Sequence, residues 1–151
     1  MNPAEQAAWD AYAARQRKRV ALHETAHVQV AVALGARGRI EARVDQRPDH
    51  GGHVRIQRPA HWTPVEAIAW ALAGRGAELA DAGIPMPLRL VEDVLEMEHE
   101  PDLVRMIRND PSLAEEGLKL SQRIVWELLD SIRRGAGVLE DHAGERVDVD
   151  V

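Results

Sequence analysis

The stretch VALHETAHVQVAVAL, from Val20 to Leu34, decides how this chain folds. It is strongly apolar, rich in alanine and free of glycine and proline, which favours a buried helix. Gly35 follows directly and predicts the end of that helix. The segment from Ala4 to Ala14 is also rich in alanine, and we expect it to continue through Arg15–Arg19 into the same helix.

Outside this stretch, the patterns predict further helices and two short strands. Thr63-Pro64-Val65-Glu66 combines a capping box with proline at the first helical position, so a helix is expected from there to about Ala82. Alternating apolar and polar residues predict strands at Ile40–Val44 and His53–Gln57, joined by the turn-rich loop Gln46–Gly52. The other helices are expected from Leu88 to His99, from Pro101 onward, and from a second capping box at Ser112–Glu115 to a stop at Gly135.

The composition agrees with a mainly helical chain. Of the 151 residues 45% are hydrophobic, phenylalanine is absent and tyrosine occurs once, whereas strands favour aromatic residues. We predict one mainly helical α+β domain over residues 1–139 with a small two- to three-stranded sheet, and an acidic, flexible tail over residues 140–151. The net charge of −6 argues against nucleic acid as a partner. No apolar run reaches the roughly 20 residues that span a membrane, so we expect no membrane partner and a cytoplasmic location.

The apolar stretch contains the pattern His23-Glu24-Thr25-Ala26-His27. Residues i and i+4 lie on one face of a helix, so the imidazoles of His23 and His27 can reach the same ion. Neutral imidazole suits zinc, and histidines inside an apolar helix would be costly without a partner. Glu24 lies beside the first histidine, where it can act as a general base on a water molecule without ligating the metal. The pattern predicts Zn²⁺ as a cofactor and hydrolysis as the reaction.

The third zinc ligand is less clear from the sequence. Because the chain has no cysteine, the ligand must be His, Asp or Glu. A third histidine shortly after a glycine would need Gly and His at positions now held by Val30 and Ala33. The candidates that remain are Asp102, Glu78, Asp93 and His99.

Four motifs in order give this chain a resemblance to a known family. They are Ala21-Leu22-His23-Glu24-Thr25-Ala26-His27, Gly51-Gly52-His53-Val54, Leu72-Ala73-Gly74-Arg75-Gly76-Ala77-Glu78-Leu79 and Pro101-Asp102-Leu103. Over roughly residues 20–108 the chain resembles the peptidase domain of the FtsH family of membrane-bound, ATP-dependent zinc proteases. The resemblance implies a helical, zincin-like fold and a zinc metalloendopeptidase that hydrolyses proteins or peptides.

By this resemblance the zinc ligands would be His23, His27 and Asp102, with Glu24 as the base. Asp102 also suits its place in the first turn of a helix opened by Pro101, where a carboxylate is favoured. Glu78 is the alternative ligand, or a carboxylate that orients a ligand histidine. Two departures from the family are Thr25 and Ala26. The ATPase module is also missing, because no phosphate-binding loop of that class occurs.

The expected partner is an unfolded protein or peptide substrate, delivered with or without a separate unfoldase or regulatory protein. The strand residues His53, Val54, Arg55 and Ile56 could hold an extended substrate by strand addition, or form a plain structural hairpin. The alternative function is a non-catalytic, peptidase-like binding module that keeps the metal site and acts through a partner protein. The intact Glu24 argues against it.

Overall fold

The computed structural model describes residues 1–45 and 51–151. Its helices are α1 (Pro3–Ala33), α2 (Pro64–Asp81), α3 (Val91–Met97), α4 (Pro101–Asn109) and α5 (Ser112–Asp141), with a 3₁₀ turn η1 (Leu88–Leu90) before α3. Its strands are β1 (Arg39–Val44), β2 (Gly52–Arg55) and β3 (Val147–Asp150). The prediction of a mainly helical domain with a small sheet is confirmed. Most of the predicted loop Gln46–Gly52 lies outside the described residues.

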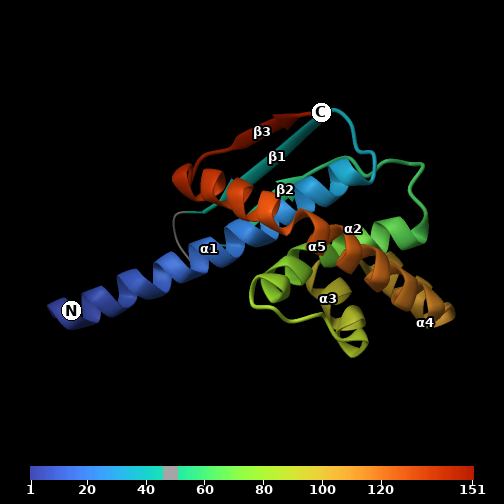
Figure 1. The fold of residues 1–151 in the computed structure, drawn as a ribbon, viewed down its shortest axis with the longest axis horizontal. Helices are drawn as coiled ribbons and strands as arrows, with labels where there is room; N and C mark the ends of the chain where they lie inside the picture. The colour runs from blue at the N-terminus through green and yellow to red at the C-terminus, as the bar shows by residue number, and fades with distance from the viewer. Residues whose placement is uncertain (46–50) are drawn as a thin grey trace.

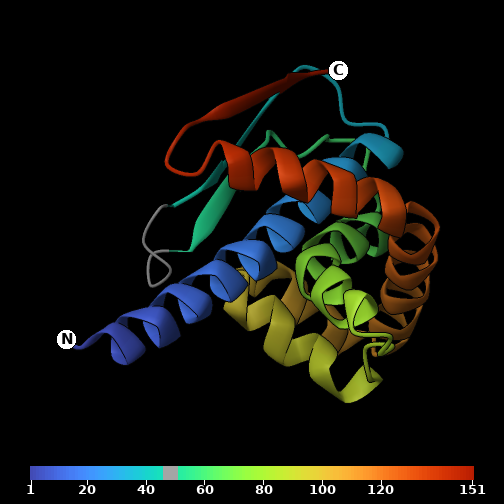
Figure 2. The same cartoon turned by 60° about the vertical axis from the view of Figure 1, so that its left-hand side comes forward.

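Helices α1, α2 and α5 pack on one another and form the centre of the molecule. The sheet lies along one side of α1 and α5, and α3 and α4 gather on the other side (Figures 1 and 2). One hydrophobic cluster joins α1, α2, α5 and the sheet, and includes the fully buried Ile40 and Ile132. A second cluster, with Leu72 and Leu95, joins α2 to α3, α4 and the start of α5. The second cluster fixes the α3–α4 pair against α2.

Helix α1 is continuous over its whole length, as the sequence predicted. Asn2 and Glu5 form a capping box at its start, and the helix ends at Ala33, just before Gly35. Its first half projects from the body (Figure 1), whereas most residues from Ala21 to Ala31 are buried. The pattern from His23 to His27 therefore lies in the part of the helix that is mostly buried. No helix in the described ranges is both long and apolar enough to cross a membrane.

Helix α5 differs from the prediction at both ends. Its N-cap is Pro111 without a side-chain cap, and the Ser112 hydroxyl donates instead to Asp110 Oδ1 at 2.6 Å, so the capping box predicted at Ser112 does not form. The helix also passes Gly135, where a stop was predicted, and continues to Asp141. A Cβ on Gly135 would lie 2.6 Å from Thr25 Cγ2, so this glycine serves the close packing of α5 on α1.

The C-terminal segment forms a strand, which differs from the predicted flexible tail. The sheet order is β2-β1-β3 and both pairings are antiparallel, with Ile40 opposite Val149. Val147 and Val149 are partly buried and pack on the hydrophobic cluster, while Asp148 alternates with them and meets Arg39 at 2.5 Å. The acidic composition suggested disorder, but the period-2 pattern of valines is that of a half-buried strand. Strand β2 ends at Arg55, so Ile56, which the prediction placed in the strand, lies beyond its end and packs against the hydrophobic cluster.

Candidate metal centre

The two histidines of the pattern lie on one face of α1, next to helix α2. Their ring centroids are 4.9 Å apart. The imidazole of His23 lies directly against the backbone of Gly74 in α2, where a Cβ would come within 2.4 Å of the ring. Any other residue at position 74 would therefore meet the His23 ring, which makes this glycine part of the site.

His27 is held by two hydrogen bonds to a single residue of α2. Its Nδ1 lies 3.0 Å from the carbonyl oxygen of Trp70, and the indole Nε1 of Trp70 donates to the carbonyl oxygen of His27 at 3.0 Å. A carbonyl oxygen only accepts, so Nδ1 of His27 carries the proton of that bond. The other ring nitrogen, Nε2, is then the one with a lone pair for a metal ion.

His23 is held in the corresponding way by Glu78 of α2. Glu78 Oε2 lies 3.0 Å from His23 Nδ1, and the Glu78 side chain is buried. Arg19 and Arg75 lie 3.2 Å and 3.7 Å from the same carboxylate. A carboxylate that orients a ligand histidine makes a contact of this kind, which is the second role considered for Glu78. The contact leaves Nε2 of His23 directed away from Glu78.

Glu98, at the end of α3, faces the Nε2 atoms of both histidines. Its Oε1 lies 2.7 Å from His23 Nε2 and its Oε2 lies 3.4 Å from His27 Nε2. His23, His27 and Glu98 each offer one ligand atom, and these atoms lie within 4.8 Å of one another. The structure thus brings a carboxylate to the histidine pair that the sequence reasoning did not consider.

The chain places Glu98 by reversing sharply after α3. His99 adopts a left-handed conformation with φ of 57°. The backbone nitrogens of His99 and Glu100 donate to the carbonyls of Glu96 and Leu95 at 3.1 Å and 3.0 Å, which is the pattern of a Schellman motif. A glycine usually occupies the left-handed position of this motif. Because a histidine stands there, the sequence did not predict the turn. Pro101 then begins α4.

These residues fit a zinc ion. Nε2 of His27 is buried and has no hydrogen-bond partner among the described residues, which is costly unless a ligand binds it. Two imidazole nitrogens and one glutamate oxygen form a ligand set of catalytic zinc sites, in which a fourth position is left for water. The Nδ1 atoms of His23 and His27 are hydrogen-bonded to a carboxylate and to a backbone carbonyl. Zinc-binding histidines usually make such a bond with the ring nitrogen that does not bind the metal.

Glu24 faces the same space as the ligands. It lines a cavity of about 430 Å³ together with His23, Glu98 and Gly52. Only 8% of Glu24 is exposed, and this burial raises the pKa of its carboxyl, against the opposing effect of His27 and His23. A carboxyl with a raised pKa is a stronger base than an exposed one, which suits proton transfer.

In the absence of a metal ion, a proton holds His23 and Glu98 together. Burial alone would lower the pKa of His23, but the hydrogen bonds to Glu78 and Glu98 outweigh it and raise the pKa to about 10. Burial would likewise raise the pKa of Glu98, but its contacts with His23 and His27 lower the pKa to about 2. A metal ion would therefore replace a proton between these two side chains.

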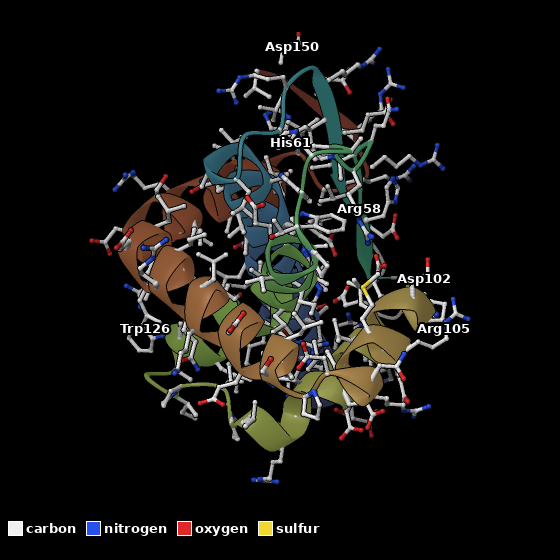
Figure 3. The ribbon with its side chains drawn as sticks, turned by 90° about the vertical axis from the view of Figure 1, so that its right-hand side faces the viewer. Arg58, His61, Asp102, Arg105, Trp126 and Asp150 are labelled. Atoms are coloured by element: carbon white, nitrogen blue, oxygen red, sulfur yellow. The ribbon has the colours of Figure 1, made fainter. Side chains whose placement is uncertain are left out.

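The structure does not bring Asp102 into this group, although the resemblance implied that it would be a ligand. Its carboxylate is 67% exposed and forms an ion pair with Arg105 of the same helix. Both residues lie at the periphery on α4 (Figure 3). Asp93 and His99, the other candidates, are exposed as well and are not members of the group. The physical reason is the turn at His99, which directs Glu98 inward and leaves the first turn of α4 on the surface.

Strand β2 begins at the edge of the cavity. Gly51 and Gly52 line the cavity, and a Cβ on Gly52 would come 2.5 Å from the Arg43 carbonyl and 3.1 Å from Glu24 Cγ. Because position 52 is a glycine, β2 can lie close to α1 beside Glu24. In the sheet as described, β2 pairs with β1 on one side only. Of the residues predicted to hold substrate, His53, Val54 and Arg55 lie in this edge strand, and Ile56 lies just beyond it.

No protein-family model, curated protein or solved structure matches this chain. The resemblance to the FtsH peptidase domain therefore stays a prediction that rests on its motifs.

Proposed function

We propose that this protein is a zinc-dependent metallopeptidase that hydrolyses peptide bonds in extended protein segments. The observation that carries the proposal is the convergence of His23, His27 and Glu98 on one point beside the buried Glu24. The ligand set differs from that implied by the resemblance, because Glu98 takes the place of Asp102.

The side chains divide the chemistry between them. A zinc ion held by His23, His27 and Glu98 would supply a Lewis acid that polarises the scissile carbonyl and makes a water molecule acidic. Glu24 accepts the proton of that water as the water's oxygen attacks the carbonyl carbon. As the C–N bond breaks, the carboxyl of Glu24 gives the proton to the departing amine, and the base is regenerated. Burial of Glu24 keeps this proton transfer away from bulk solvent.

Strand β2 supports a peptide as the substrate. Its unpaired edge offers main-chain donors and acceptors to an extended segment, and its first residue lies beside Glu24. A segment bound there as an added strand would bring a main-chain carbonyl to the cavity. Such binding requires an unfolded stretch of substrate, supplied directly or by a separate unfoldase.

The test of the activity compares the wild type with a Glu24→Gln variant. We expect the wild type to bind one zinc per chain and to cleave an unfolded protein such as casein. Glu24→Gln should keep the zinc and lose about 10²- to 10⁴-fold in rate, the usual contribution of a general base. Cleavage at the wild-type rate by the variant would refute the mechanism. Zinc binding by the wild type without any cleavage would favour the non-catalytic binding module.

The test of the ligand set compares two carboxylates that are close in sequence. Glu98→Gln should lose most bound zinc, because it removes one of three ligands. Asp102→Asn should retain wild-type zinc, because the Asp102 carboxylate is 67% exposed and pairs with Arg105 on the surface of α4. The opposite result, with loss only in Asp102→Asn, would restore the ligand set that the resemblance implies.

A further inference from the structure

Arg58, in the segment after β2, contacts one residue next to each of two proposed ligands. These residues are Glu100, in the turn that carries Glu98, and Trp70, which is hydrogen-bonded to His27. Arg58 Nη2 donates to Glu100 Oε2 at 2.6 Å, two residues after Glu98. Its guanidinium carbon lies 6.0 Å from the ring centroid of Trp70, the residue that holds His27. Figure 3 shows Arg58 on the same side of the molecule as the start of α4.

The turn that carries Glu98 is built around His99. His99 is a non-glycine residue in the left-handed region, a conformation that L side chains rarely adopt. Within the turn itself, the backbone bonds to Leu95 and Glu96 fix the path of the chain but do not fix its distance from α1. The ion pair between Arg58 and Glu100 is mostly shielded, with side chains 36% and 20% exposed, and it joins the turn to the segment after β2.

Arg58 also lies over the ring of Trp70, the residue of α2 that is hydrogen-bonded to His27. Trp70 exchanges two hydrogen bonds with His27, and its ring lies tilted against that of Trp62 with 5.9 Å between the centroids, so the ring has little freedom to move. A guanidinium near an aromatic ring is attracted to its face and restricts the side chain. Arg58 therefore connects a rigid part of the His27 support to the less constrained turn of Glu98.

We propose that Arg58 is a positioning residue that sets the distance between Glu98 and His27, and thereby the affinity of the site for zinc. This inference rests on the proposed metal site. It assigns to Arg58 a role through Glu100 and Trp70, without contact with the metal or the substrate.

The experiment measures zinc affinity by competition with a chelator in the full chain. The variants are Arg58→Gln, Glu100→Gln and the double variant, with Arg133→Gln as the control. Arg133 forms a comparable ion pair with Asp81 at 2.8 Å, away from the cavity. We expect each single variant to bind zinc about 10-fold more weakly, as is typical for lost support of a ligand. The double variant should be no weaker than Arg58→Gln, because Arg58→Gln already removes the ion pair with Glu100.

A second readout separates positioning from general stability. With Co²⁺ in place of zinc, the visible absorption bands report ligand geometry, and we expect them to shift in Arg58→Gln and Glu100→Gln but not in Arg133→Gln. Arg58→Lys keeps a charge near Glu100 and should recover part of the affinity lost in Arg58→Gln. Should Arg58→Gln fail to fold, Glu100→Gln alone decides, because it leaves Arg58 in contact with Trp70.

The outcomes distinguish this inference from the proposed function. Wild-type protein that binds no zinc would overturn both. Wild-type protein that binds zinc, with Arg58→Gln and Glu100→Gln within twofold of it and with unchanged cobalt bands, would overturn the role of Arg58 alone.

Discussion

A methyl group added at Gly74 should damage the zinc site while leaving the fold in place. In the structure, a Cβ at this position would lie 2.4 Å from Cδ2 and Nε2 of His23, whereas ordinary contacts begin at 3.4 Å. The ring would therefore have to move by about 1 Å, and metal ligands must be held to within roughly 0.5 Å. We expect Gly74→Ala to bind zinc at least about 10-fold more weakly, comparable to the loss of an outer support.

The effect of Gly74→Ala on stability should be modest. Overpacking of this size costs roughly 1–3 kcal/mol, and replacing glycine by alanine inside a helix returns about 1 kcal/mol. Denaturant unfolding of the metal-free protein should therefore show a loss of at most about 2 kcal/mol. The loss of zinc affinity would then reflect the position of His23 and not unfolding.

Gly76 provides the matched control, since it lies two residues away in the same helix. A Cβ there meets nothing within 4 Å. Gly76→Ala should stabilise the metal-free protein by about 0.5–1 kcal/mol through helix propensity, and zinc affinity should stay at the wild-type value. The reasoning would be refuted if Gly74→Ala bound zinc as tightly as Gly76→Ala, because the ring of His23 would then not lie where the structure has it.

Three further predictions follow from the same contacts. In the metal-free protein, the raised pKa of His23, about 10, adds stability below about pH 6.5 that is lost as the pH rises through 10. The lowered pKa of Glu98, about 2, adds stability above about pH 4.5 that is lost as the pH falls through 2. Denaturant unfolding followed from about pH 2 to about pH 11 should show both losses. Glu78→Gln should weaken zinc binding about 10- to 100-fold in a chelator competition, and unchanged affinity would contradict its support of His23. His99→Gly should raise the unfolding free energy by about 1 kcal/mol by relieving the left-handed conformation, and a lower unfolding free energy would contradict that account.

The sequence predicted the helices well because their signals are local. The capping box at Thr63 and the apolar run from Val20 to Leu34 each specify a helix through neighbouring residues. The same locality made the pair of His23 and His27 visible, because the i, i+4 spacing alone puts both on one face. The register of the sheet and the strand at Val147–Asp150 depend on distant partners, and composition alone suggested a tail there.

The third carboxylate could not be found in the same way. Glu98 lies 75 residues beyond His23 and meets it only because α3 packs on α2 and the chain then reverses at His99. A glycine at that position would have indicated the turn, but a histidine in the left-handed conformation gives no such signal. Asp102 was favoured because the resemblance implied it, and its place after Pro101 at a helix start agreed. A helix start shows where a residue lies in the chain but not which way its side chain faces.

Three glycines near the site share a position that the sequence did not predict, since each lies directly against α1. Three consecutive residues of α1 are each faced by a glycine: His23 by Gly74 of α2, Glu24 by Gly52 of β2, and Thr25 by Gly135 of α5. Each glycine allows a backbone to approach α1 more closely than any side chain would permit. From sequence these glycines resemble a helix motif, a turn and a helix stop. In space they bring the main chain of α2, β2 and α5 against one turn of α1. The proposed first ligand is thus packed by α2 and the proposed base by β2, which are distant from each other in the sequence. A site held in this way tolerates little change at these glycines, even though none of them touches the metal or the substrate in the proposed reaction.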